Sequence, residues 1–336
     1  MTPLCSAPFT SYSHKPEGFR PCCSRHAKPI QSDVATWWNG EYLREFRKNM
    51  FRYDTLPPEC KACIDEDGAG GEKYSHRFDM SRYNAETGEV SCSPSQVYLF
   101  TGNKCNLACE MCDSTFSDQH AKQFPDRVIP VTGELIDPLA IAGYFEPAQW
   151  VVYGGEPILF DRLYDLVLTL LQKGGMISFL TNGMYNVATD PVFQDLIFKF
   201  PKRFSVTFSI DGDEKLNESI RHGASTKRIL QNTKACLEAG VFTDIHFTHS
   251  TLNTHGFVDF CRMLLDSGLY EYPFTFNTCA VEFPRHFSPH MLQQEEKAKV
   301  IDDILSFTEE MALPEDMMIA CQNVISALQH KVGDIL

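Results

Sequence analysis

Three cysteines, Cys105, Cys109 and Cys112, lie together in the run CNLACEMC with the spacing Cys-x3-Cys-x2-Cys. Thiolates are soft ligands that suit iron–sulfur clusters and zinc. A [4Fe–4S] cluster usually takes four cysteines, so three leave one iron atom without a protein ligand. An open iron can bind a reactant instead of only passing electrons, and the spacing therefore predicts radical chemistry. A zinc site is the alternative, although structural zinc prefers four closed ligands.

The composition describes an acidic globular chain of 336 residues, 43% of them hydrophobic, with a formal net charge of −14. This charge argues against binding to a nucleic-acid backbone, which needs basic surface. We find neither a secretory signal pattern nor an apolar run near the roughly 20 residues of a membrane span. Thirteen cysteines without an export signal favour metal or redox chemistry over disulfides. We expect a cytoplasmic protein with no membrane partner.

From about residue 95, short apolar runs alternate with amphipathic helical patterns. The runs, six predicted strands, are residues 97–100, 150–153, 176–180, 204–210, 242–248 and 273–277. The clearest helical patterns between them are 161–173 and 226–239, and two more follow Pro289, reaching about 311 and running from 314 to about 331. This alternation predicts an α/β fold with parallel strands and right-handed crossovers. Six repeats suit an open, partial (β/α)6 TIM-like barrel better than a closed eight-fold one.

Polar motifs follow the first four predicted strands at the point where each strand ends. They are Cys105 after the first, Gly154-Gly155-Glu156-Pro157 after the second, Thr181-Asn182-Gly183 after the third and Ser209-Ile210-Asp211-Gly212 after the fourth. Reactive groups of parallel α/β folds sit at the carboxyl ends of the strands. We therefore expect these motifs to meet at one edge of the sheet.

With the cysteine triplet after the first strand and GGEP after the second, residues 95–285 resemble the radical S-adenosylmethionine (SAM) superfamily. The resemblance implies that Cys105, Cys109 and Cys112 hold a [4Fe–4S] cluster whose fourth iron is chelated by SAM. Reduction of the cluster then cleaves SAM to a 5′-deoxyadenosyl radical, which takes a hydrogen atom from the substrate. The resemblance also implies a reductant such as flavodoxin or ferredoxin.

The same resemblance assigns roles in SAM binding to the strand-end motifs. Gly154 and Gly155 allow the backbone to approach the methionyl end, where a side chain would stand in the way. Glu156 holds the SAM ammonium group. Ser209 and Arg221, twelve positions apart, resemble a pair that contacts the SAM carboxylate in peptide- and sulfatase-maturing members. Paired arginine donors suit a carboxylate.

Further SAM contacts are expected at the ribose and the adenine. Asp211 and Asn182 would contact the ribose or structure the loops. Met111 stands before the third cysteine, where the family packs the adenine, and residues 281–283 would add backbone contacts to it. The alternatives are ordinary turns at Asn182 and Asp211, each of which precedes a glycine, and a surface ion pair for Arg221.

A second set of cysteines lies in residues 1–92, a segment that otherwise indicates irregular structure with one helix near 37–50. The set comprises Cys5, Cys23, Cys60 and Cys63, with Gly18 five positions before Cys23. Two pairs of thiolates can close a tetrahedral site, which structural zinc also fits. The pattern resembles the twitch domain, a truncated SPASM auxiliary-cluster domain, which implies one auxiliary [4Fe–4S] cluster on these four cysteines.

Two features depart from that family pattern. The domain precedes the barrel here, whereas it follows the barrel in the resembled members. Cys22 stands beside Cys23 and makes that ligand ambiguous, and Cys92 is a weaker substitute. Buried core positions are expected for the remaining cysteines, Cys236, Cys261, Cys279 and Cys321.

These patterns divide the chain into an auxiliary-cluster domain (1–92), a radical SAM core (93–285) and a helical carboxyl-terminal segment (286–336). If the auxiliary cluster accepts an electron from a substrate radical, a base must take a proton near the substrate carbon. The candidates for this base are His249 and Glu282, followed by His246 and His286. A core or rim position is the plainer reading of each of these histidines.

The sequence thus predicts a radical SAM enzyme acting on a small polar metabolite or short peptide. The first alternative is a ribosomal-peptide or protein maturase that forms a crosslink or thioether. The second is a non-catalytic iron–sulfur binding protein, against which the intact GGEP and the Ser209–Arg221 pair argue.

Overall fold

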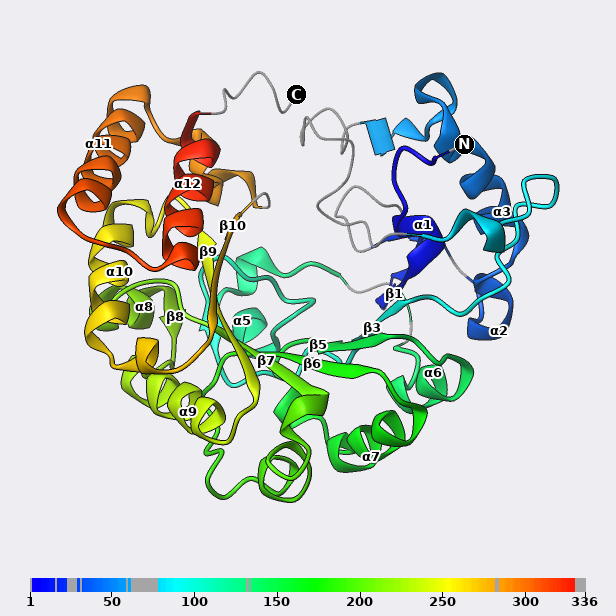
Figure 1. Ribbon diagram of the computed structural model, residues 1–336, viewed down its shortest axis with the longest axis horizontal. Helices are drawn as coiled ribbons and strands as arrows, with labels where there is room; N and C mark the ends of the chain where they lie inside the picture. The colour runs from blue at the N-terminus through cyan, green and yellow to red at the C-terminus, as the bar shows by residue number, and fades with distance from the viewer. Residues whose placement is uncertain are drawn as a thin grey trace. The chain divides into compact units, whose positions relative to one another are not determined.

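The computed structural model describes residues 2–15, 17–22, 29–30, 32–58, 60–61, 78–130, 133, 135–281 and 284–329 (Figure 1). The chain separates into two compact units, each assembled from distant segments. Unit 1 comprises Met1–Gly102, Pro130–Gly154 and Tyr164–Ser178, and unit 2 comprises Asn103–Ile129, Gly155–Leu163 and Phe179–Leu336. The boundaries expected from the sequence, at 92 and 285, stay predictions.

Unit 1 contains parallel strands covered by helices. Strand β3 (Gln96–Phe100) pairs in parallel with β5 (Gln149–Tyr153) and, on its other side, with β1 (Ser11–Lys15). The helices of this unit are α1 (Ala7–Thr10), α2 (Val34–Trp37), α3 (Glu41–Lys48), α6 (Pro138–Tyr144) and most of α7 (Leu163–Lys173). Alternate apolar residues of β3 are fully buried, as are three in the middle of β5, and together they form the core of the unit.

The amino-terminal segment is more regular than its sequence indicates. Strand β1 pairs antiparallel with β2 (Gly18–Arg20), so the hairpin extends the sheet where we expected an irregular segment. Tyr12 on β1 and Phe19 on β2 are fully buried, and Phe19 stacks on Trp37 with ring centroids 5.3 Å apart. Because the strand SYSHK contains only one apolar residue, periodicity could not identify it; aromatic packing by distant residues stabilises the hairpin.

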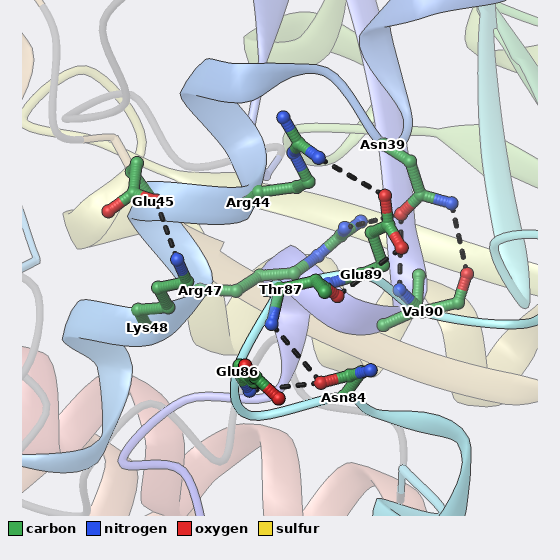
Figure 2. A network of polar contacts seen from close by, with 10 residues as sticks. All are labelled: Asn39, Arg44, Glu45, Arg47, Lys48, Asn84, Glu86, Thr87, Glu89 and Val90. Atoms are coloured by element: carbon green, nitrogen blue, oxygen red, sulfur yellow. Dashed lines mark hydrogen bonds and ion pairs between the residues drawn. The ribbon is translucent and has the colours of Figure 1, made fainter.

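A polar network fastens α3 to the segment that leads into β3 (Figure 2). Arg47 is fully buried; its Nε donates to the carbonyl of Pro8 at 2.9 Å and its Nη1 to Oδ1 of Asn39 at 3.0 Å. The guanidinium carbon lies 4.5 Å from the ring centroid of Trp38. Asn39 also exchanges two hydrogen bonds with the backbone of Val90, at 3.0 and 3.1 Å. Burial lowers the pKa of Arg47 to about 9, so the side chain is charged at neutral pH.

Unit 2 has a parallel sheet and the carboxyl-terminal helices. Strands β7 (Phe204–Ser209), β9 (Phe242–His249) and β10 (Thr275–Ala280) pair in that order. Burial alternates along β7 and β9: Phe204, Val206 and Phe208 of β7 are buried, as are Thr243, Ile245, Phe247 and His249 of β9, and the residues between them are half-exposed. The helices are α5 (Asp118–Gln123), α8 (Glu214–Ile220), α9 (Thr226–Glu238), α10 (Phe257–Asp266), α11 (Gln294–Glu310) and α12 (Glu315–Gln329). Helix α12 lies beside α11 and packs on β10, whose Phe276 amide donates to Asp316 at 2.8 Å (Figure 1).

The full sheet has the strand order β10-β9-β7-β6-β5-β3-β1-β2, in which β6 is Met176–Thr181. All six predicted strands are present and neighbour one another in chain order, which confirms a mainly parallel α/β fold. The helices expected at 161–173, at 226–239 and after Pro289 are also present within two or three residues of their predicted bounds. Within the described ranges, no helix is both long and apolar enough to cross a membrane.

Candidate functional site

The three cysteines lie in a loop of unit 2 that is fixed at both ends. The Cys105 amide donates to Oδ1 of Asp118 at 3.0 Å, and the Ser117 hydroxyl, which caps α5, donates to the carbonyl of Leu107 at 2.7 Å. Farther along, the short strand β4 (Ala108–Cys109) pairs antiparallel with β8 (Arg221–His222), and Cys109 stands opposite Arg221. The loop geometry therefore depends on the start of α5 and on β8.

The thiols of this loop lie near enough to one another to interact electrostatically. Burial raises the pKa of Cys109 to about 11, with Arg221 opposing the rise, and it raises the pKa of Cys112 still further. Burial likewise raises the pKa of Cys105. The free thiols are therefore protonated at neutral pH, and binding of iron must release protons.

The sulfur donors of this loop are of the kind that iron–sulfur clusters take. Among the described residues, no three histidine, cysteine or carboxylate side chains converge in the way that a single ion requires. A cubane does not need that convergence, because each cysteine binds a different iron atom. Cys105 is 8% exposed, and Cys109 and Cys112 are half-buried.

Glu156 joins the second and third strand-end motifs. Its carboxylate is buried and accepts the Thr181 hydroxyl at 2.9 Å, the Asn182 amide at 2.8 Å and the Ile158 amide at 3.2 Å. Burial raises the pKa of Glu156 to about 7, and the three donors oppose the rise. The carboxylate thus positions the turn after β6. Its contact with a SAM ammonium group stays a prediction.

Asn182 in turn reaches the cysteine loop. Its Nδ2 donates to Oδ1 of Asn106 at 2.8 Å and lies 3.8 Å from Sγ of Cys105, while its Oδ1 accepts the Met184 amide at 3.0 Å. The structure therefore brings the first three motifs together, as expected for carboxyl ends of parallel strands. Asn106 was missed by the sequence analysis, since an asparagine inside the triplet carries no pattern of its own.

The two glycines of the GGEP motif stand where the backbone is crowded. A Cβ on Gly154, whose φ is +158°, would lie 2.6 Å from the carbonyl oxygen of Gly102 in unit 1. A Cβ on Gly155 would lie 2.6 Å from the carbonyl oxygens of both Lys104 and Phe116 in unit 2. Both glycines are therefore required for close packing of the loops themselves.

Asp211 and Arg221 form a buried ion pair beside Cys109. Oδ2 of the fully buried Asp211 accepts Nε of Arg221 at 2.6 Å, and Oδ1 accepts the Thr248 amide at 2.8 Å. Nη1 of Arg221 lies 4.0 Å from Sγ of Cys109. Burial by itself would lower the pKa of Arg221, but Asp211 and Cys109 outweigh burial and raise it. The pair joins the ends of β7 and β9 to β8; the ribose and SAM carboxylate contacts stay predictions.

A second polar cluster holds the outer side of the loop and was missed by the sequence analysis. Glu110 bonds Nε2 of His222 at 2.9 Å and Nη1 of Arg127 at 3.0 Å, and its amide donates to the carbonyl of Ile220 at 2.9 Å. Arg127 also covers the ring of Phe124 at 4.5 Å. Its members are scattered over more than 100 positions, so spacing could not reveal it.

Ser209 and Met111 are half-buried. Ser209 ends β7 and stands opposite His246 of β9. Burial lowers the pKa of His246, whose neighbours include Asp211 and Arg221. His246 therefore lies near the ion pair on the half-exposed side of the strand.

The predicted bases occupy different surroundings. His249 is 1% exposed, its Nε2 bonds Thr254 at 2.9 Å, and burial lowers its pKa to about 3. His286 is exposed and its ring lies 4.1 Å from that of Phe287. Glu282 lies outside the described residues, as does Phe283, whereas Val281 is buried. A catalytic role for any of these residues stays a prediction.

The predicted auxiliary cysteines are described only in part. Cys23 and Cys63 lie outside the described residues, while Cys5, Cys22 and Cys60 are half-buried. Cys92 is also half-buried, and its carbonyl accepts Nε1 of Trp38 at 2.7 Å. The buried cysteines Cys236, Cys261 and Cys321 occupy helices as expected, and Cys279 is half-buried on β10.

Comparisons with known proteins agree with this arrangement. Residues 99–264 match the family model of the radical SAM superfamily. Pre-heme d1 synthase of Dinoroseobacter shibae is 22% identical over 199 residues, which are 59% of this chain and 47% of the relative. This chain thus spans about half the length of that curated relative.

Two solved structures have lower similarity. Streptococcus suis SuiB bound to S-adenosylmethionine is 13% identical with a TM-score of 0.42, covering 66% of this chain and 49% of that one. Native anSMEcpe with bound AdoMet is 17% identical with a TM-score of 0.46. The similarity covers 64% of this chain and 60% of that one. Residues 99–264, which contain the cysteine loop and the strand-end motifs that meet on it, are thus similar to the radical SAM superfamily over about half of this chain.

Proposed function

We propose that this protein is a radical SAM enzyme in which Cys105, Cys109 and Cys112 hold a [4Fe–4S] cluster with SAM on its fourth iron. When bound, the cluster and SAM supply a one-electron cleavage that gives a 5′-deoxyadenosyl radical able to take hydrogen from an unactivated C–H bond. The observation that carries this proposal is that Asn182, which follows β6, reaches Cys105, while Arg221, which lies on β8, reaches Cys109.

The protein's own part is to fix the ligands and keep the site ordered. Glu156 holds the turn that presents Asn182, and the absence of side chains at Gly154 and Gly155 lets the loops close together. Ser209 and Arg221 would bind the SAM carboxylate, for which Arg221 has donors besides the Nε that Asp211 takes. Met111 would contact the adenine.

For the substrate we propose a small polar metabolite or short peptide. The similarity to a pre-heme d1 synthase supports a small molecule, since that name describes a small-molecule precursor. Candidate substrates can be sorted by isotope transfer: a compound deuterated at the reacting carbon must pass deuterium to 5′-deoxyadenosine. A reductant such as flavodoxin or ferredoxin would supply the electron.

We further propose that Cys5, Cys23, Cys60 and Cys63 hold an auxiliary [4Fe–4S] cluster that accepts an electron from the substrate. Support comes from Arg47, whose buried Nη2 lacks a hydrogen-bond partner among the described residues. A buried cation of this kind is expensive without a nearby anion, and a cluster with four thiolates would be anionic.

Anaerobic reconstitution with iron and sulfide, followed by dithionite and SAM, tests the proposal. We expect 5′-deoxyadenosine, detected by mass spectrometry, from the wild type and none from the variant with Cys105, Cys109 and Cys112 changed to Ala. Cys236→Ala, which removes a buried thiol from α9, is the matched control and should retain the product. Absence of 5′-deoxyadenosine from a wild type with full iron content would contradict an enzymatic role and favour a non-catalytic iron–sulfur protein.

A further inference from the structure

Two of the three loop cysteines have a side-chain N–H donor aimed at their sulfur. Nη1 of Arg221 lies 4.0 Å from Sγ of Cys109, and Nδ2 of Asn182 lies 3.8 Å from Sγ of Cys105. The backbone amide of Leu107 adds a second donor to Sγ of Cys105 at 3.4 Å. No hydrogen bond from another side chain to Sγ of Cys112 is found within the described part of the chain, where this sulfur instead faces the carbonyl of Asp113 at 3.6 Å.

The donor on Cys109 is held in place without help from SAM. Cys109 and Arg221 are directly opposed in the β4–β8 ladder, so backbone hydrogen bonds fix the distance between their Cα atoms. Asp211 then orients the guanidinium through Nε at 2.6 Å, and Asp211 is itself anchored by the Thr248 amide. The Arg221 side chain is only 10% exposed, so solvent screens its charge weakly.

Hydrogen bonds and positive charge at a cluster's sulfur ligands favour the reduced state, because reduction adds negative charge to iron and sulfur. A buried cation stabilises the added negative charge strongly, because the local dielectric constant is low. Asp211 offsets part of the charge of Arg221, but its carboxylate binds Nε whereas Nη1 faces the sulfur, so the positive end of the pair points to Cys109.

On these grounds, and resting on the proposed function, we propose that Arg221 sets the reduction potential of the SAM-binding cluster through Cys109, with Asn182 acting in the same direction through Cys105. Arg221 is thus a positioning and tuning residue in the SAM-free enzyme, in addition to any contact with the SAM carboxylate. Its effect must therefore be measurable before SAM is added.

The test is an EPR-monitored redox titration of anaerobically reconstituted full-length protein without SAM, following the cluster whose signal changes when SAM is then added. Three substitutions separate charge from hydrogen bonding: Arg221→Lys keeps charge, Arg221→Gln keeps amide donors, and Arg221→Met keeps neither. We expect Arg221→Met to lower the equilibrium constant for cluster reduction at least tenfold, which is about 59 mV for one electron. The reduction potentials of Arg221→Lys and Arg221→Gln should lie between those of the wild type and Arg221→Met.

Arg262→Met is the matched control, because it removes the same charge from α10, where Arg262 is half-exposed and pairs with Glu310. Its potential should equal that of the wild type. If Arg221→Met fails to assemble the cluster, Asn182→Ala provides the second arm and should also lower the potential.

Equal potentials for the wild type, Arg221→Met and Asn182→Ala would overturn the inference, as would a shift of the same size in Arg262→Met. If the three substitutions of Arg221 shift the potential equally, and the shift parallels a loss of bound iron, Arg221 has a purely structural role. Failure of the wild type to form any SAM-responsive cluster would instead contradict the proposed function, so the two failures are distinguishable.

Discussion

The backbone amide of Asn182 donates to Oε2 of Glu156 at 2.8 Å, across 26 positions of sequence. This bond makes the turn after β6 depend on the turn after β5. Since Asn182 also reaches Cys105, the geometry of the cysteine loop depends indirectly on a carboxylate that the sequence analysis assigned to SAM alone.

Glu156→Gln should change how stability depends on pH. Burial raises the pKa of Glu156 from 4.5 to about 7, so between these values the folded state binds more protons than the unfolded state. Stability is then highest below about pH 4.5 and falls as pH rises to 7, by on the order of 2–3 kcal/mol from this group. Urea unfolding of the metal-free protein between pH 5 and 8 measures this pH dependence of the free energy of unfolding. We expect a flatter slope in Glu156→Gln, and an identical slope would refute the buried titration.

Gly155→Ala should disrupt the site more than its single methyl group implies. The added Cβ would lie 2.6 Å from two backbone carbonyl oxygens, which cannot move without moving the cysteine loop. We expect a loss of about 2–4 kcal/mol in the free energy of unfolding and reduced iron content after reconstitution. Gly143→Ala on α6 is the control, since nothing lies within 4 Å of its Cβ; it should be neutral or stabilise by up to about 1 kcal/mol. Equal effects of both substitutions would contradict this account.

Arg47→Met should destabilise unit 1. The change removes the bonds to Pro8 and Asn39 and the contact with the Trp38 ring, and it leaves the carbonyl of Pro8 and Oδ1 of Asn39 with one donor fewer each. We expect a loss of about 2–3 kcal/mol by urea unfolding. Lys48→Met, on the same helix and paired with the exposed Glu45, should cost less than about 0.5 kcal/mol. A stability of Arg47→Met equal to that of Lys48→Met would show that the network contributes little.

Cys60→Ala should separate the two proposed clusters. If each cluster holds four iron atoms, iron and acid-labile sulfide should fall from about eight to about four per chain while 5′-deoxyadenosine formation from SAM persists. Cys92→Ala is the matched control from the same segment and should keep about eight. Retention of eight irons in Cys60→Ala, or loss of four in Cys92→Ala, would reassign the auxiliary ligands.

Local patterns in the sequence determined the class of the fold and the type of chemistry. The six predicted strands, β3, β5, β6, β7, β9 and β10, are short runs rich in apolar residues that helices cover, so their hydrophobic pattern was enough to predict them. The sequence also predicts the triplet Cys105, Cys109 and Cys112 as a ligand set, because the spacing of ligands within one loop is a local property. Local sequence does not predict the hairpin β1–β2, because its stability comes from contacts of Tyr12 and Phe19 with distant residues.

Only the tertiary structure decided what surrounds the cysteines. Arg221 is separated from Cys109 by 112 positions, and the two meet because β4 and β8 pair. The ion pair with Asp211 and the bond from Asn182 to Asn106 likewise join segments that the sheet brings to one edge. Such contacts follow from topology and burial, which depend on residues throughout the chain. The cysteine spacing, in contrast, is a property of a few consecutive residues.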